Sequence, residues 1–254
     1  MEQKIYEMIQ DAEMILIGIG EEFSPKYQPQ QTADCEYVDS VNEVLESYRK
    51  SQFYAQLPAE HEVIQAYNKL RELIGAKPYF VVTLNTDDLI YRSNLEKDLI
   101  VAPCGSMQKM QCSEHIVDAA EIRDAVLQAA DGGAGVNALQ GAKCPICGAP
   151  LAFHTIETEG YLEEGYLPQW SHYTKWLSCT LNRKLCVLEL GVGFRFPQVI
   201  RFPFEKAAVY NQKACLIRVN SKFPQLPEEM AQRGVSVRET PEVFLKDILD
   251  EICR

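Results

Sequence analysis

The 254-residue sequence contains no uninterrupted apolar run of the roughly 20 residues that a membrane-spanning helix needs. Its opening residues from Met1 to Lys4 lead into a mixed polar and apolar segment, without the basic stretch and apolar core of a secretion signal. Positive charge is also scarce, because 36 acidic residues against 25 lysines and arginines give a net charge of −11. This balance disfavours a nucleic acid or an anionic membrane as partner. We therefore expect a soluble cytoplasmic protein with neither kind of partner.

The cysteines do not form the even set that is typical of a disulfide scaffold, since the sequence has nine. Several lie inside apolar runs, as Cys186 and Cys215 do, and this is more natural in a reducing compartment.

Two closely spaced pairs of soft metal ligands stand out among these residues. Cys112 and His115 are separated by two residues, and the C-P-I-C segment from Cys144 to Cys147 is followed by a glycine. Thiolates at this spacing reach one ion from a tight turn, and a histidine nitrogen completes the tetrahedral set of a structural zinc site. The alternative is that the first pair consists of ordinary surface residues and that the second turn has lost its metal.

Helical and strand patterns alternate along the rest of the chain. The apolar spacing predicts helices over residues 5–11 and 60–73, and short apolar runs predict buried strands over 14–19, 79–84, 185–190 and 214–219. The strands end in glycine, asparagine or aspartate, as expected at the ligand-binding edge of a Rossmann-like, doubly wound parallel sheet of the α/β class. We predict a large lobe from residues 1–103 and 183–254. Residues 104–182 then form a smaller inserted lobe with the zinc knuckle.

The end of the first strand carries half of a dinucleotide-binding fingerprint. Gly18 and Gly20 allow a tight turn and a close approach of backbone N–H groups to a pyrophosphate. The third glycine is absent, and Glu21 and Glu22 stand where their negative charge repels phosphate. A plain strand-ending turn is therefore an equal alternative.

The second strand ends in Asn85-Thr86-Asp87. An amide and a carboxylate at a strand end can orient a ribose or a carboxamide through hydrogen bonds. The alternative is an Asx turn that caps the next segment and uses the same residue types.

The order of these segments resembles the sirtuin family from the first strand almost to the end of the chain. Residues 67–70 and 82–87 resemble the helix and strand around the sirtuin Asn-Ile-Asp motif, and Cys104-Gly105-Ser106 stands where sirtuins carry His-Gly-Ser. The two ligand pairs fall at the sirtuin zinc site, and Gly191 and Gly193 fall at its Gly-Thr-Ser phosphate loop. Residues 188–194 and 200–204 are similar to the macrodomain-linked bacterial sirtuins, which resemble ADP-ribosyltransferases acting on lipoyl-carrier proteins.

This resemblance implies NAD and zinc as cofactors and a protein acceptor, either a lipoyl carrier or an acylated protein. Asn85 and Asp87 are then expected to orient the nicotinamide and its ribose, and Asn220 to hold the adenosine half. The resemblance also implies that four glycines admit the phosphates: Gly18, Gly20, Gly191 and Gly193. The implied reaction is ADP-ribosyl transfer from NAD to a protein side chain, with lysine deacylation second.

Three departures from the family pattern affect the chemical half of the site. Cys104 occupies the position that resembles the base of the family. Sirtuins usually carry histidine there, and the macrodomain-linked group carries glutamine. No Asp-Phe-Arg segment follows the first glycines, and Arg195-Phe196 replaces an Asn-Thr pair. A free thiol with a pKa near 8.5 acts as a base only if its pKa is tuned. The alternative to a divergent enzyme is a pseudoenzyme that binds NAD, ADP-ribose or a protein without catalysis.

Overall fold

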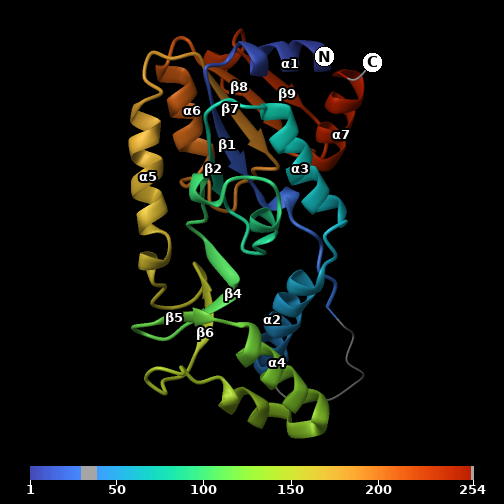
Figure 1. The fold of residues 1–254 in the computed structure, drawn as a ribbon, viewed down its shortest axis with the longest axis vertical. Coiled ribbons are helices and arrows are strands. Elements are labelled where there is room, and N and C mark those ends of the chain that lie inside the picture. Colours follow the sequence, from blue (N-terminus) through green and yellow to red (C-terminus); the bar gives the residue numbers. More distant parts are fainter. Residues whose placement is uncertain (30–38, 253–254) are drawn as a thin grey trace.

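The computed structural model describes residues 1–29 and 39–252 of the chain, and its large lobe is built on a six-stranded sheet (Figure 1). The strand order is β3-β2-β1-β7-β8-β9, and every neighbouring pair is parallel. The strands are β1 (Met14–Ile19), β2 (Tyr79–Thr83), β3 (Ile100–Val101), β7 (Leu185–Leu190), β8 (Cys215–Val219) and β9 (Gly234–Val237). The chain winds outward from β1 and β7 in both directions. The predicted doubly wound parallel sheet is confirmed.

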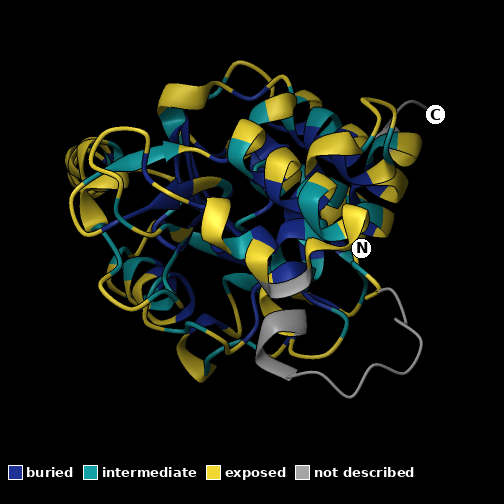
Figure 2. Cartoon of the chain, turned by 90° about the horizontal axis from the view of Figure 1, so that it is seen from below, coloured by how far each residue is buried: buried dark blue, intermediate teal, exposed yellow. Residues whose placement is uncertain are grey.

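Helices cover both faces of this sheet, which explains why its strands are apolar on both sides. On one face lie α1 (Glu2–Asp11), α3 (Glu62–Ile74) and α7 (Pro241–Ile252), and on the other lie α5 (Leu167–Ser178) and α6 (Arg201–Tyr210). Alternate residues of β1 contact the two layers, so Ile15 and Ile17 pack on the first and Leu16 on the second. Figure 2 shows the buried residues gathered between these layers.

The local sequence accounts for the bounds of α3, which closely follow the predicted helix. The His61 ring nitrogen Nδ1 accepts a hydrogen bond from the Val63 N–H at 3.3 Å and caps the first turn. Gly75 ends the helix with a φ of +57°, a backbone conformation that glycine adopts without steric cost. Tyr67 and Leu70 lie on the buried face between these ends.

The smaller lobe contains a separate antiparallel sheet in which β4 (Gly105–Gln111) lies between β5 (Ile116–Asp118) and β6 (Ala152–Thr155). Its core forms where α2 (Asp39–Gln56) and α4 (Ala120–Ala129) pack against this sheet. Leu45 and Tyr48 of α2 are buried there beside Met110.

Two helices cross the lobe boundaries that the sequence predicts. Helix α2 comes from the range 1–103 but packs on the small lobe, whereas α5 comes from the range 104–182 and packs on the large sheet through Tyr173 against Phe80. The apolar face of each helix, rather than its position in the chain, decides the lobe on which the helix packs.

A charged cluster is buried in the large lobe beneath the end of β7. Glu189 and Arg218 are register partners on β7 and β8, and both side chains are almost fully buried. The Arg218 guanidinium donates to both Glu189 oxygens, at 2.7 and 3.1 Å, and to Glu205 of α6 at 2.7 Å. The buried Glu189–Arg218 pair and the partly exposed Glu205 thus hold β7, β8 and α6 together.

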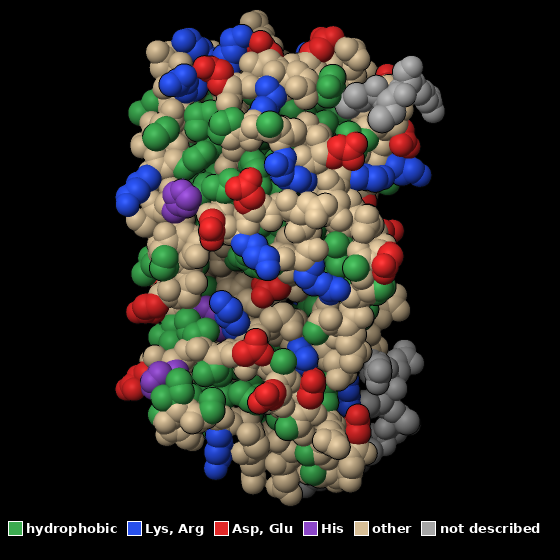
Figure 3. Space-filling view, in the orientation of Figure 1, with side chains coloured by type: hydrophobic (Ala, Val, Ile, Leu, Met, Phe, Trp, Pro, Cys, Tyr) green, Lys and Arg blue, Asp and Glu red, His purple; other side chains and the backbone are tan. Residues whose placement is uncertain are grey.

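Charged side chains of both signs are interspersed over the face of the molecule that Figure 3 shows. In the part of the chain that the structure describes, no helix combines the length and the apolar character needed to cross a membrane.

Candidate functional site

Loops from the carboxyl ends of β1 and β7 cross each other at very short range. The Gly20 N–H donates to the Leu190 carbonyl at 2.9 Å, and a Cβ at Gly20 would collide with the backbone of Gly191 and Val192. Gly191 also has a φ of +69°, which favours glycine. These two glycines therefore allow the two loops to approach each other, and their contact with a phosphate stays a prediction. Gly18 lies inside β1, where its small size admits the Phe204 ring of α6, and this packing reason needs no phosphate.

Two carboxylates lie on the backbone of these loops. The Gly193 N–H donates to Glu21 Oε2 at 3.3 Å, and a Cβ at Gly193 would collide with the same side chain. Glu22 accepts from the Ser221 N–H at 2.9 Å and from its hydroxyl. The sequence marks both glutamates as repelling phosphate, but it does not show that they bond to the opposing loops.

Asn220, at the end of β8, is buried and bonded within the chain through both its amide nitrogen and its oxygen. Its amide group donates to the Val192 carbonyl at 3.2 Å, and its oxygen accepts from the N–H groups of Lys222 and Phe223 at 2.9 and 2.6 Å. The side chain therefore ties the loop after β7 to the loop after β8. Its contact with an adenosine ribose stays a prediction.

The Asn85 and Asp87 side chains bond to the segment that follows β1. Asn85 donates to the Phe23 carbonyl at 3.1 Å. Asp87 accepts from the Ser24 hydroxyl at 2.5 Å through one oxygen and from the Leu89 N–H at 2.9 Å through the other. The second bond is the Asx turn that the sequence offers as an alternative, and it leaves the other oxygen to hold Ser24. Burial raises the pKa of Asp87, although the Ser24 hydrogen bond opposes this shift.

Cys104 precedes β4 and lies in the hinge between the lobes with a 1% exposed side chain. Burial raises the pKa of its thiol to about 12. A thiol with a pKa this high is protonated at neutral pH. The following Gly105 has a φ of +84° and lies against the His154 carbonyl, which leaves no room for a Cβ.

A cavity of about 1080 Å³ lies between the two lobes. Its lining joins strand-end residues to small-lobe residues, among them Glu21, Ser24, Asn85, Cys104, Glu157 and Arg195. The Arg195 guanidinium pairs with Glu157 and so links the loop after β7 to the segment after β6. The structure thus brings Asn85 and Cys104 to one cleft and places Asp87 behind Ser24. Their catalytic roles stay predictions.

The four sequence-predicted metal ligands come together at one end of the small lobe. The ligand atoms of Cys112, His115, Cys144 and Cys147 all lie within 4.8 Å of one another. Cys112 Sγ is 3.5 Å from His115 Nδ1 and 3.7 Å from Cys147 Sγ. A tetrahedral zinc ion with bonds of about 2.0–2.3 Å has ligand–ligand distances of about 3.5–3.8 Å. The donor set therefore fits zinc in its chemistry, and two of its distances match a bound ion, whereas Cys144 Sγ lies 4.0 Å from His115 Nδ1.

Electrostatics also prepare the first of these ligands for a metal. The Glu114 N–H and the His115 ring lower the pKa of Cys112 to about 6, because both stabilise its thiolate. A thiolate is the form that binds zinc.

Comparison with known proteins gives a consistent structural match. No family model matches the chain. A crystal structure of a Sir2 homologue in complex with NAD covers 100% of this chain and 94% of its own at a TM-score of 0.64, with 14% identity. A structure described for the mechanism and regulation of Sir2 enzymes gives a TM-score of 0.61 with 18% identity and covers 100% and 97%. The chain has the sirtuin fold.

Among sequences, a protein ADP-ribosyltransferase of Staphylococcus aureus (strain Mu50) is 23% identical over 262 residues, covering 91% of this chain and 81% of the relative. A Sir2–p53 peptide–NAD⁺ complex is a further structural neighbour, with 13% identity and a TM-score of 0.58, and it covers 100% of this chain and 99% of its own. The low identities place this chain as a divergent version of the sirtuin fold.

Two residues that contribute to the site escaped the sequence reasoning. Ser24 holds Asp87, and the buried Tyr67 hydroxyl lies 3.4 Å from the Phe23 carbonyl and 3.5 Å from the Asn85 amide nitrogen. Tyr67 carried a signal, because a hydroxyl on the apolar face of a helix needs a partner when it is buried. Ser24 carried none.

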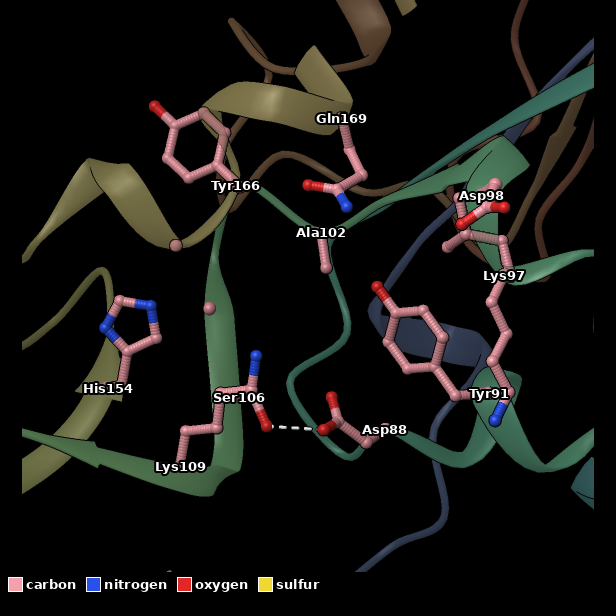
Figure 4. A pocket seen from close by; sticks show the side chains of 13 residues that line it. Asp88, Tyr91, Lys97, Asp98, Ala102, Ser106, Lys109, His154, Tyr166 and Gln169 are labelled. Carbon is pink, nitrogen blue, oxygen red and sulfur yellow. Dashed lines mark hydrogen bonds between the residues drawn. The ribbon is translucent and has the colours of Figure 1, made fainter. Parts of the chain in front are cut away.

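A separate cavity of about 370 Å³ includes Asp88, Ser106 and His154 in its lining (Figure 4). The Ser106 hydroxyl donates to Asp88 at 2.6 Å, and burial raises the pKa of Asp88 to about 6. Asp88 has a φ of +61°, and the chain turns at this residue, directly after Asp87. Asp87 consequently bonds to a residue of the large cleft, whereas Asp88 lines the smaller cavity.

Proposed function

We propose that this chain binds NAD in the cleft between its lobes and transfers the ADP-ribosyl group to a protein side chain. The observation that carries the proposal is the convergence of Asn85, Cys104 and the Ser24–Asp87 pair with the crossed glycine loops at one edge of a parallel sheet. The similarity to the staphylococcal ADP-ribosyltransferase and to NAD-bound Sir2 structures supports it.

The residues of the chain have distinct tasks in this proposal. Bound NAD supplies an ADP-ribosyl group with nicotinamide as the leaving group. Asn85 lines the cleft and Asp87 lies directly behind Ser24, and their hydrogen bonds to Phe23 and Ser24 hold the amide and the carboxylate in a set geometry near the nicotinamide end. A carboxylate there favours the positive charge that develops on the ribose when nicotinamide departs. The acceptor is a protein, and we propose a lipoyl carrier or an acylated protein.

We also propose zinc as the metal of the small lobe, held by Cys112, His115, Cys144 and Cys147. The distances between their ligand atoms support this choice. The metal's task is structural, because the chain itself provides all four positions of a closed tetrahedral site.

The Cys104 position distinguishes between the competing functions. The resemblance to sirtuins implies that lysine deacylation needs a base at the position of Cys104. A thiol with a pKa of about 12 does not supply one. A protein that only binds its ligand also agrees with this thiol. Transfer and binding without catalysis are separated by measuring nicotinamide release.

We expect wild-type protein to release nicotinamide very slowly, or not at all, with acetylated peptides, while low-level transfer of label from NAD to a carrier protein persists. A general base contributes about 10²–10⁴-fold. Cys104→His is therefore expected to raise nicotinamide release by up to about 10²-fold, whereas Cys104→Gln, whose amide is not a base, is expected to leave it unchanged. The measurement is a side-by-side time course with labelled NAD and both acceptors.

Cys179→His is the matched control, because Cys179 is an exposed cysteine at the end of α5 and does not line the cleft. This variant should behave like the wild type. Robust deacetylation by the wild type would contradict the proposal. Transfer that survives both Cys104→Ala and Asp87→Ala undiminished would place the reaction outside this cleft.

A further inference from the structure

Glu21 occupies the cleft face of the crossed glycine loops. It follows Gly20 in the turn after β1, lines the large cavity, and accepts a hydrogen bond from the Gly193 N–H at 3.3 Å. Its side chain is so close to Gly193 that a Cβ at this residue would overlap Glu21 Oε1. The carboxylate therefore covers a backbone donor of the loop after β7 from the cavity side.

Glu22 makes an equivalent connection to the loop after β8. Its carboxylate accepts from both the N–H and the hydroxyl of Ser221, next to the buried Asn220. The Glu22 backbone N–H donates to the Gly191 carbonyl at 3.2 Å, so this residue is fixed from two sides. Consecutive glutamates thus bond to the two loops at which a dinucleotide's phosphates and adenosine half are expected.

Backbone N–H groups at the carboxyl edge of a parallel sheet attract anions. A carboxylate has the same sign of charge and the same acceptor geometry as a phosphate oxygen. Because Glu21 is joined covalently to the loop, it competes with a dissolved ligand at a high effective concentration. A like charge within hydrogen-bonding distance also repels any phosphate that approaches while the carboxylate stays in place.

We infer that Glu21 is a specificity-determining residue, which holds the Gly193 donor against pyrophosphate-bearing ligands and must move aside before one binds. Glu22 serves as the fixed neighbour that keeps the turn in position. This inference rests on the proposed function, because it concerns the same cleft and the same class of ligand. It goes further because it assigns a role to Glu21, which in the dinucleotide-binding fingerprint is only a departure from the pattern.

The test compares ADP-ribose with adenosine, which lacks phosphate, by calorimetric titration of the purified full chain. We expect Glu21→Gln to bind ADP-ribose about tenfold more tightly than the wild type, because the substitution removes the charge but keeps the side-chain size. Adenosine affinity should not change. Glu13→Gln removes one charge at the opposite end of β1, where Glu13 pairs with Arg183, and should match the wild type.

The outcomes separate this inference from the proposed function. Equal or weaker ADP-ribose binding by Glu21→Gln, measured beside a wild type that binds, overturns the inference and leaves the proposed function standing. Binding by Glu21→Gln but not by the wild type supports the inference and contradicts the proposed function of the natural chain. If neither protein binds ADP-ribose at millimolar concentration, the proposed function fails and the inference fails with it. Thermal unfolding of each variant verifies that the turn after β1 still folds.

Discussion

Replacing Cys144 by Ser is expected to lower the thermal stability of the small lobe sharply and to abolish stoichiometric zinc. Cys144 is buried, and its sulfur lies 4.0 Å from His115 Nδ1 in the ligand cluster. Structural zinc sites contribute folding free energy, with apparent binding free energies of about 10–16 kcal/mol in isolated zinc fingers. Even a partial loss is therefore expected to cost more than about 3 kcal/mol. Elemental analysis and thermal unfolding, with hydrogen exchange of β4–β6, give the measurement.

Cys179→Ser is the control for this substitution, since it removes an exposed thiol outside the cluster. It should keep about one zinc per chain and the wild-type melting temperature. Natively folded protein that contains no metal would contradict the assignment of the cluster.

The second large effect concerns the charges buried beneath the cleft. Glu189→Gln leaves Arg218 in the interior with only Glu205 as a charged partner, at 2.7 Å. Removing one partner of a buried ion pair costs about 3–5 kcal/mol, and Glu205, which is 23% exposed, compensates the Arg218 charge only in part. We expect a decrease of this size in the free energy of unfolding, measured by urea denaturation at neutral pH.

The paired variant Glu189→Leu with Arg218→Leu tests the cause of this loss. Removing both charges also removes the free-energy cost of burying them away from water. Much of the stability lost in Glu189→Gln should therefore return. Glu13→Gln on the exposed edge should change the free energy of unfolding by less than about 1 kcal/mol. A loss in Glu189→Gln as small as that of this surface variant would show that Arg218 is solvated.

The architecture was predictable because the decisive residues repeat with the period of their own element. Apolar strands that end at Gly20, Asn85, Gly191 and Asn220 indicate a parallel sheet whose ligand edge gathers those ends, and the structure has this sheet. The grouping of the four candidate metal ligands was predictable for a similar reason, since two pairs of close spacing are local features.

The interactions between distant segments were not predictable in the same way. The packing of α2 on the small lobe depends on Tyr48 meeting the ring of Phe153, about 100 positions later in the chain. The bond from Gly193 to Glu21 likewise exists only after two loops have crossed. Glu21 was therefore interpreted from its charge alone, as a repulsive residue, whereas in the fold it is a hydrogen-bond acceptor.

Asp87 shows how one side chain can satisfy two interpretations. The Asx turn and a functional contact require the same carboxylate, and the sequence offers no way to choose between them. In the fold one oxygen makes the turn with Leu89 and the other holds Ser24 at the cleft. Only the placement of the segment after β1 reveals the second contact.

The central claim is that the cleft binds a nicotinamide dinucleotide with Asp87 at the nicotinamide end. The most direct measurement is the rise in melting temperature with increasing NAD and, separately, ADP-ribose, for the wild type and for Asp87→Ala. We predict a concentration-dependent rise with both ligands for the wild type and a selective loss of the response to NAD in the variant. No rise with either ligand at millimolar concentration, or an equal response of both proteins to NAD, would contradict this account.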